Sequence, residues 1–363
     1  QLNAEKVHAV GGGVQFVGDL FLCYRVNLES RIASRVLWQV ATSVYRSEED
    51  VYRTVFALPW TDWFDPARTI RVDVSATKSP LTSLNFVTLK IKDAVCDKIR
   101  KLSNRRPNVD TGAPDIPIQG HLTEREFTLY LDTTGEPLFK RGQRIATGEA
   151  PLRENLAAGI LRLAGWTPGI PLLDPMCGSG TILLEAAQMA LEIAPGLGRH
   201  FAFEKFKNFD AGRWRELIQR RSARRKPRTP QPIYGSDLSG DVLGAARANL
   251  AGAGLENVVS LKRASVLDIT APATEGIIVT NPPYGVRLAE QQVLAEFYPK
   301  LGDVLKQQFT GWRAYFLSAD MRLAKLIHLA TSKRTPLFNG ALECRLFEYK
   351  MVAGGMRQKK LEE

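Results

Sequence analysis

A short apolar strand that runs directly into a glycine-rich turn constrains the fold of this 363-residue chain most strongly. Residues 172–181 have the sequence LLDPMCGSGT, and helical spacing of apolar residues continues to Ala194. From Glu149 onward, short apolar strands, glycine turns and helices alternate. This alternation predicts an α/β domain built around a parallel sheet.

The same patterns predict where the individual elements lie. In the second half, helices are expected at 151–165 and 181–194, strands at 172–174, 233–237, 259–264, 277–279 and 314–318, and an antiparallel ending at 335–339 and 343–350. The first half is expected to contain short strands within 6–26, a helix over 28–44, strands at 70–76 and 127–132, and a helix at 85–102. These mixed elements predict a small α+β domain over 1–137, followed by the α/β domain over 138–363.

The glycine turn and two acidic residues indicate a nucleoside-binding site. Gly178 and Gly180 can adopt positive φ and let a ligand approach the backbone, while the helix N-terminus favours a carboxylate group. Asp237 ends the next strand, where a carboxylate can accept both ribose hydroxyls, and Asp268 follows the third strand, where it could contact an adenine amino group. Singly, each acid could also be an ordinary turn or cap residue. The turn lacks the full GxGxxG spacing, which disfavours a nicotinamide cofactor.

The most specific motif is Asn281-Pro282-Pro283-Tyr284, directly after an apolar strand. Two prolines make the loop stiff. The Asn281 oxygen and a neighbouring backbone carbonyl can accept both hydrogens of an exocyclic amine, while the Tyr284 ring stacks on the base. This arrangement turns the nitrogen lone pair toward a methyl donor, so catalysis is mainly positioning in a water-poor site. The alternative is a purely structural turn.

Positive charge is concentrated in one short segment. The chain has a net charge of +11, yet residues 1–135 contribute only +1, whereas residues 199–228 contribute +8. A cluster of one sign favours binding to a polyanion, although a solvated helical face is the alternative. The candidate RNA contacts are Arg220, Arg221, Arg224 and Arg225 in this segment, together with Lys90, Lys92, Arg105 and Arg106 along the 85–102 helix or just past it.

Other classes of protein are disfavoured by what the sequence lacks. The four cysteines and four histidines have no metal-ligand or redox spacing, so no metal is expected and a reducing cytoplasm fits the chain. No run reaches the ~20 apolar residues of a membrane span. The chain opens at Gln1 within a strand-like stretch, which suggests that a preceding piece is missing.

The ordered motifs at 174–181, Asp237, Asp268 and 281–284 resemble those of S-adenosylmethionine-dependent amino-methyltransferases. The upstream half resembles a THUMP domain through 12–14, 90–94 and 106–110. With residues 150–157, the whole arrangement resembles the bacterial 23S ribosomal RNA guanine-N2 methyltransferases. The implied architecture is a Rossmann-like class I methyltransferase domain with a basic insert at 199–228, preceded by a THUMP domain and a partial ferredoxin-like unit.

The resemblance also implies roles for individual residues. S-adenosylmethionine would be held by the glycine turn and the acids and apolar residues near it: Asp174, Met176, Cys177, Gly178, Gly180, Asp237, Leu238, Val266 and Asp268. Asn281, Pro282 and Tyr284 would hold the target guanine, and the partner would be 23S rRNA. Three alternatives stay open: a tRNA guanine-N2 methyltransferase, an adenine-N6 DNA methyltransferase, and a non-catalytic RNA-binding factor with a vestigial pocket.

Overall fold

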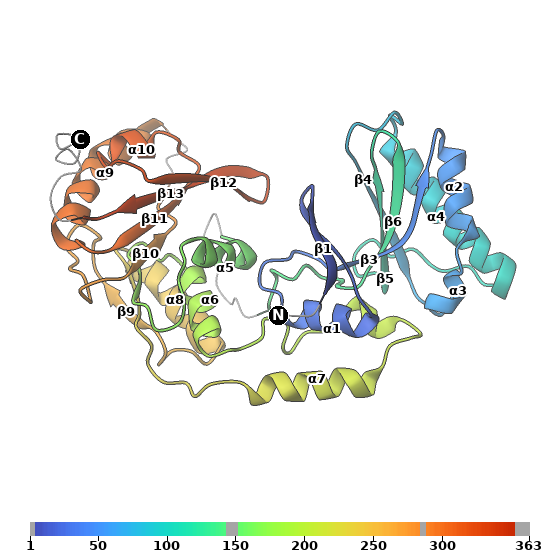
Figure 1. Ribbon diagram of the computed structural model, residues 1–363, viewed down its shortest axis with the longest axis horizontal. Helices are drawn as coiled ribbons and strands as arrows, with labels where there is room; N and C mark the ends of the chain where they lie inside the picture. Colours follow the sequence, from blue (N-terminus) through green and yellow to red (C-terminus); the bar gives the residue numbers. More distant parts are fainter. Residues whose placement is uncertain (1–3, 143–151, 284–287, 353–363) are drawn as a thin grey trace. The chain divides into compact units, whose positions relative to one another are not determined.

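The computed structural model describes residues 4–142, 152–283 and 288–352, without the side chains of 288–291. The chain divides into two compact units (Figure 1). One comprises Gln1–Lys140 and Pro195–Ser222, and the other comprises Arg141–Ala194 and Ala223–Glu363. No helix of the described residues is long and apolar enough to cross a membrane.

The first unit contains a four-stranded sheet with the strand order β3-β6-β5-β4, in which only β4 and β5 run parallel. Helices α2 and α4 pack against each other beside this sheet (Figure 1). The elements are β1 (Glu5–Val10), β2 (Gly13–Val17), α1 (Leu20–Glu29), β3 (Leu37–Val44), α2 (Glu48–Ala57), α3 (Trp60–Trp63), β4 (Ile70–Ala76), α4 (Leu84–Ser103), β5 (Ile116–Leu122) and β6 (Glu126–Asp132).

The predicted helix over 28–44 is wrong. Helix α1 begins earlier, at Leu20, where the Asp19 side chain accepts the Leu22 N–H at 2.7 Å, and it ends at Glu29. Residues 37–44 form β3, which pairs with β6 from Leu37 to Val44. The β-branched and aromatic residues of this stretch suit a strand, and pairing with β6 outweighs the apparent helical spacing.

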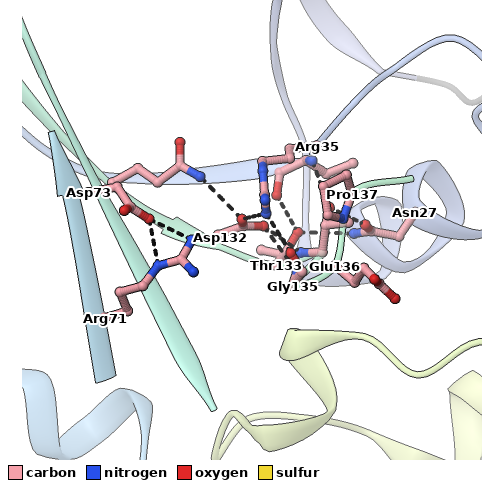
Figure 2. Close-up of polar contacts among 12 residues, drawn as sticks. Asn27, Arg35, Arg71, Asp73, Asp132, Thr133, Gly135, Glu136 and Pro137 are labelled. Carbon is pink, nitrogen blue, oxygen red and sulfur yellow. Dashed lines mark hydrogen bonds and ion pairs between the residues drawn. The ribbon is translucent and has the colours of Figure 1, made fainter. Parts of the chain in front are cut away.

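Buried polar contacts join α1 to the end of β6 (Figure 2). The Asn27 side chain donates to the Thr133 hydroxyl at 3.0 Å and accepts from the Thr134 hydroxyl at 2.7 Å. Arg35 forms an ion pair with Asp132. Burial raises the pKa of Asp132, and the Arg35 charge opposes that rise. Separating these groups would leave buried polar atoms without hydrogen-bond partners, which is costly. The contacts therefore hold the N-terminal segment to the sheet.

The basic segment was expected as an insert of the second domain, but most of it packs within the first unit. Aromatic side chains explain this placement. Phe203 of the 3-10 helix η1 (Ala202–Lys205) stacks on Tyr24, with ring centroids 4.5 Å apart, and Trp214 of α7 (Ala211–Ala223) meets Phe203 edge-on at 5.1 Å. The net charge of the segment divides evenly, with +4 on residues 199–222 and +4 on residues 223–228.

The second unit contains a seven-stranded sheet in the order β12-β13-β11-β10-β7-β8-β9. Strands β7 to β11 run parallel, and β12 and β13 add an antiparallel hairpin. The elements are α5 (Glu154–Leu163), β7 (Leu172–Asp174), α6 (Thr181–Ala190), β8 (Ile233–Asp237), α8 (Gly240–Gly252), β9 (Ser260–Arg263), β10 (Ile277–Thr280), α9 (Leu288–Gln308), β11 (Arg313–Ser318), α10 (Leu323–Leu326), β12 (Lys333–Asn339) and β13 (Leu342–Lys350). The predicted parallel sheet and antiparallel ending are confirmed.

Candidate active site

The carboxyl ends of three adjacent parallel strands bring the predicted acids and amide to one edge of the sheet. β7 lies between β8 and β10, with Asp174 opposite Gly235 and Leu173 opposite Ile278. Asp174 ends β7, Asp237 ends β8, and Asn281 follows the last residue of β10. In open α/β sheets this edge is where ligands bind.

The glycine turn between β7 and α6 has the backbone conformation that its sequence predicts. Gly178 and Gly180 have φ values of 55° and 80°. A Cβ at Gly180 would lie 3.2 Å from the Ala246 side chain, so this glycine permits close packing of α8, whereas the space beside Gly178 is open. The buried Asn249 of α8 donates a hydrogen bond to the Ser179 carbonyl at 3.0 Å. This contact with α8 helps to hold the turn in place.

Asp174 is a buried carboxyl group at the centre of this edge. Its side chain accepts a hydrogen bond from the Thr280 hydroxyl at 2.7 Å and one from the Met176 N–H at 3.3 Å. Burial raises the pKa of Asp174 to about 7, and the nearby Asp237 charge adds to the rise, while the two hydrogen bonds oppose it. In the free protein, the two hydrogen bonds offset only part of the cost of burying a charged carboxylate. A cationic group of a bound ligand would offset more of that cost, so Asp174 is suited to contact one.

Asp237 joins the glycine turn to the loop after β8. One of its oxygens accepts the Gly178 N–H and the other accepts the Ser239 N–H, both at 3.0 Å. Each carboxylate oxygen has a second lone pair, so both can still accept a hydroxyl hydrogen. Burial raises the pKa of the neighbouring Cys177 thiol, which keeps it protonated and unsuited to act as a nucleophile.

The other residues predicted to contact the methyl donor differ in how exposed they are to solvent. Val266 is buried in the apolar core and Leu238 is exposed. Asp268 is also exposed. It follows β9, in which Arg263 lies opposite Asp237 in the strand register. Their contacts with a bound donor stay predictions.

The described residues after β10, 281–283, lie between two contacts that the sequence motif did not identify. Thr280 contacts Asp174, and the buried Tyr298 of α9 donates its hydroxyl to the Pro283 carbonyl at 3.0 Å. Pro282 is buried and Asn281 is half-buried. The predicted stacking residue Tyr284 lies outside the described residues. Thr280 could have been predicted as a site residue, because it is the polar residue that ends an otherwise apolar strand. No local sequence feature indicates that Tyr298 contacts this loop.

The chemistry of these residues fits S-adenosylmethionine, which has a cationic centre and ribose hydroxyls. Open space beside Gly178 allows a ligand to reach the backbone, a desolvated carboxyl lies next to it, and Asp237 retains acceptor capacity. Among the described residues, no cluster of three or more His, Cys, Asp or Glu side chains could hold a metal ion.

Most of the predicted RNA-binding cations lie next to carboxylates. In the first unit Lys90 pairs with Glu49, Lys92 and Arg106 with Asp93, Arg220 with Glu216, and Arg221 with Glu29. In the second unit Arg224 pairs with Glu192 at 3.3 Å.

Arg105 and Arg225 are exposed and have no ion pair within the described part of the chain. They are therefore the best placed of the eight predicted cations to contact a polyanion. The contacts of all eight with RNA stay predictions.

Comparisons with protein families match the whole architecture. The family described as RMKL-like, methyltransferase domain, matches residues 141–348, the THUMP domain matches 45–132, and the RlmL ferredoxin-like domain matches 1–37. The expected fold class, with a Rossmann-like methyltransferase domain, a THUMP domain and a ferredoxin-like unit, is confirmed.

Individual relatives agree with these matches. “Putative RNA methyltransferase slr0064” of Synechocystis sp. is 40% identical over 97% of this chain and 92% of its own length. The ribosomal RNA large subunit methyltransferase K/L of Shewanella sp. is 37% identical over 99% of this chain, which spans about half (51%) of that protein. The crystal structure of SMU.472 complexed with SAH is 29% identical, with a TM-score of 0.86 over 96% of this chain and 92% of that one.

Proposed function

Because this chain belongs to the RMKL-like methyltransferase family and uses S-adenosylmethionine as its cofactor, we propose that it methylates the exocyclic N2 amine of a guanosine in 23S rRNA. The observation that best supports this reaction is the position of Asn281. It follows β10 at the same edge as Asp174, and the Thr280 hydroxyl joins that strand end to Asp174.

The proposed chemistry needs no nucleophilic side chain. The bound cofactor supplies an electrophilic methyl group. The Asn281 side-chain oxygen and a carbonyl of the adjoining proline loop accept the two amine hydrogens of guanine, which directs the nitrogen lone pair away from the protein and toward the donor. Pro282 and the Tyr298 hydrogen bond to Pro283 hold residues 281–283 in place, so little reorganisation is required around Asn281.

RNA as the substrate is supported by three features. A THUMP domain precedes the catalytic unit, and relatives that match nearly the full chain are named for RNA or ribosomal RNA methylation. The net charge of +11 suits a polyanionic partner. A protein acting on rRNA is expected in the cytoplasm.

The test is methyl transfer from labelled S-adenosylmethionine to three unmodified substrates: 23S rRNA, tRNA and duplex DNA. Nucleoside analysis should find N2-methylguanosine in 23S rRNA alone. Label in tRNA would favour the tRNA guanine-N2 alternative, and N6-methyladenine in DNA would favour the DNA alternative. Binding of RNA without transfer to any substrate would favour the non-catalytic factor.

A further inference from the structure

Two consecutive residues of the glycine turn are held by side chains of the β8–α8 segment. The Gly178 N–H donates to the Asp237 carboxylate at the end of β8, and the Ser179 carbonyl accepts from the Asn249 side chain of α8, both at 3.0 Å. These bonds hold the turn on both sides of the peptide group that links Gly178 to Ser179. The conformation of the turn therefore depends on residues that lie 59 and 70 positions away in the sequence.

One face of α8 packs against the turn. Ala246 lies so close to Gly180 that a Cβ on this glycine would be 3.2 Å from the Ala246 side chain. Asn249 follows three residues later, and residues with this spacing lie on the same face of a helix. Close packing of the two small residues therefore brings α8 near enough for the Asn249 amide to reach the turn.

Asn249 is an unusual residue for its position in the helix. It is 2% exposed, and the other buried residues of α8 are apolar: Leu243, Ala246 and Leu250. Burying an amide is costly unless it is hydrogen-bonded, and asparagine is a poorer helix former than leucine or alanine. The asparagine is therefore explained by its hydrogen bonding and not by the stability of the helix.

Ser179 keeps two hydrogen-bond donors for a ligand. Among the residues that the structure describes, neither its backbone N–H nor its hydroxyl has a hydrogen-bond partner. Ser179 is half-buried, it follows the open space beside Gly178, and it lies just before α6, whose N-terminus favours a carboxylate group. Because Asn249 holds the Ser179 carbonyl, it restricts the orientation of the backbone that carries these donors.

We propose that Asn249 is a positioning residue for binding of the methyl donor: it holds the Ser179 backbone in the orientation that accepts the amino-acid portion of S-adenosylmethionine. Asn249 acts through Ser179, because its buried amide is bonded to the turn. The adenosine portion is assigned to Asp237 and to the residues after β8 and β9, so its binding should not need Asn249. This inference concerns the donor site and is independent of which nucleotide is methylated.

The test is calorimetry of the full chain with two ligands: S-adenosylhomocysteine, and methylthioadenosine, which has the adenosine portion but lacks the amino-acid portion. Asn249→Leu keeps a similar shape and favours the helix, but it removes the N–H that holds Ser179. It should weaken S-adenosylhomocysteine binding by about 2- to 12-fold, the factor that corresponds to one typical hydrogen bond, and leave methylthioadenosine binding unchanged. Asn249→Ala removes the same N–H without adding apolar bulk beside the turn, and it should have the same selective effect.

Trp166→Phe is the matched control. Trp166 is 2% exposed, and its ring N–H donates to the Ile170 carbonyl at 2.8 Å, before the start of β7 and so at the opposite end of this strand from the turn. The control removes a buried hydrogen bond to a carbonyl in the same unit, so it should lower the free energy of unfolding in urea and change neither affinity. Two results would overturn the proposal: unchanged S-adenosylhomocysteine affinity in the Asn249 variants, or an equal loss of affinity for both ligands, which would indicate a purely structural contact.

Discussion

Replacing Asp174 with asparagine should stabilise the ligand-free protein while impairing donor binding. The pKa of Asp174 rises from 3.8 to about 7 because the carboxyl is buried. Each pKa unit corresponds to 1.36 kcal/mol, so keeping this group charged in the folded protein at pH 8 costs about 4 kcal/mol. The asparagine oxygen can still accept the Thr280 hydroxyl and the Met176 N–H, so the variant removes the charge and keeps the hydrogen bonds.

The sign of the pH dependence follows from the raised pKa. The folded state binds the Asp174 proton more tightly than the unfolded state, so the free energy of unfolding of the wild type falls as pH rises from about 4 to about 7 and is level above that range. The variant lacks this contribution. Its advantage should grow from about 2 kcal/mol at pH 5.5 to about 4 kcal/mol at pH 8.

The assay is urea unfolding of ligand-free wild type and Asp174→Asn at these two pH values, with donor affinity measured by calorimetry. Asp174→Asn should weaken donor binding, because a hydrogen bond to a charged group is worth roughly 1.5 to 3 kcal/mol. A variant less stable than the wild type at pH 8, or a stability difference that does not change with pH, would refute the assignment of a buried, desolvated carboxyl.

Three further predictions concern the donor, the loop and the charged segment. Asp237→Ala removes the acceptor of the Gly178 N–H and should weaken donor binding by roughly 1 to 3 kcal/mol in calorimetry. Tyr298→Phe removes the hydrogen bond to Pro283 and should lower kcat while donor affinity is unchanged, and equal loss of both would contradict a positioning role. Arg225→Ala should reduce the log–log salt slope of RNA binding by about 0.7 to 0.9, as expected for one lost phosphate contact, and an unchanged slope would exclude that contact.

The sequence predicted the catalytic half well because its signals are local. Strand β8 and the strands of the antiparallel ending lie close to the expected residues, since short apolar runs bounded by glycine and proline leave few alternatives. The edge that brings Asp174, Asp237 and Asn281 together follows from the parallel connection of strands alone.

Features that depend on contacts between distant residues could not be predicted. Strand β3 was taken for a helix because its pairing with β6, about 90 residues later, has no local signature. The basic segment was placed with the catalytic domain because chain order suggested it, whereas the stacking of Phe203 on Tyr24 holds most of it in the first unit.

Pairing also changed the interpretation of the basic residues. Counting charges along the sequence treated Arg220, Arg221 and Arg224 as equivalent to Arg225. Three of the four have a carboxylate partner, and the Arg221 side chain is only 21% exposed where it meets Glu29. A charge count gives the sign of a segment, but ion-pair geometry decides which cations are available to a partner.

The most direct test of the proposed mechanism is single-turnover methyl transfer to 23S rRNA by Asn281→Ala, measured together with donor affinity. Asn281 is assigned to the substrate amine and not to the donor, so the rate should fall by on the order of 100-fold or more while the donor affinity is unchanged. Methyl transfer at the wild-type rate, or donor binding lost together with the rate, would contradict the assignment of Asn281 to the target amine.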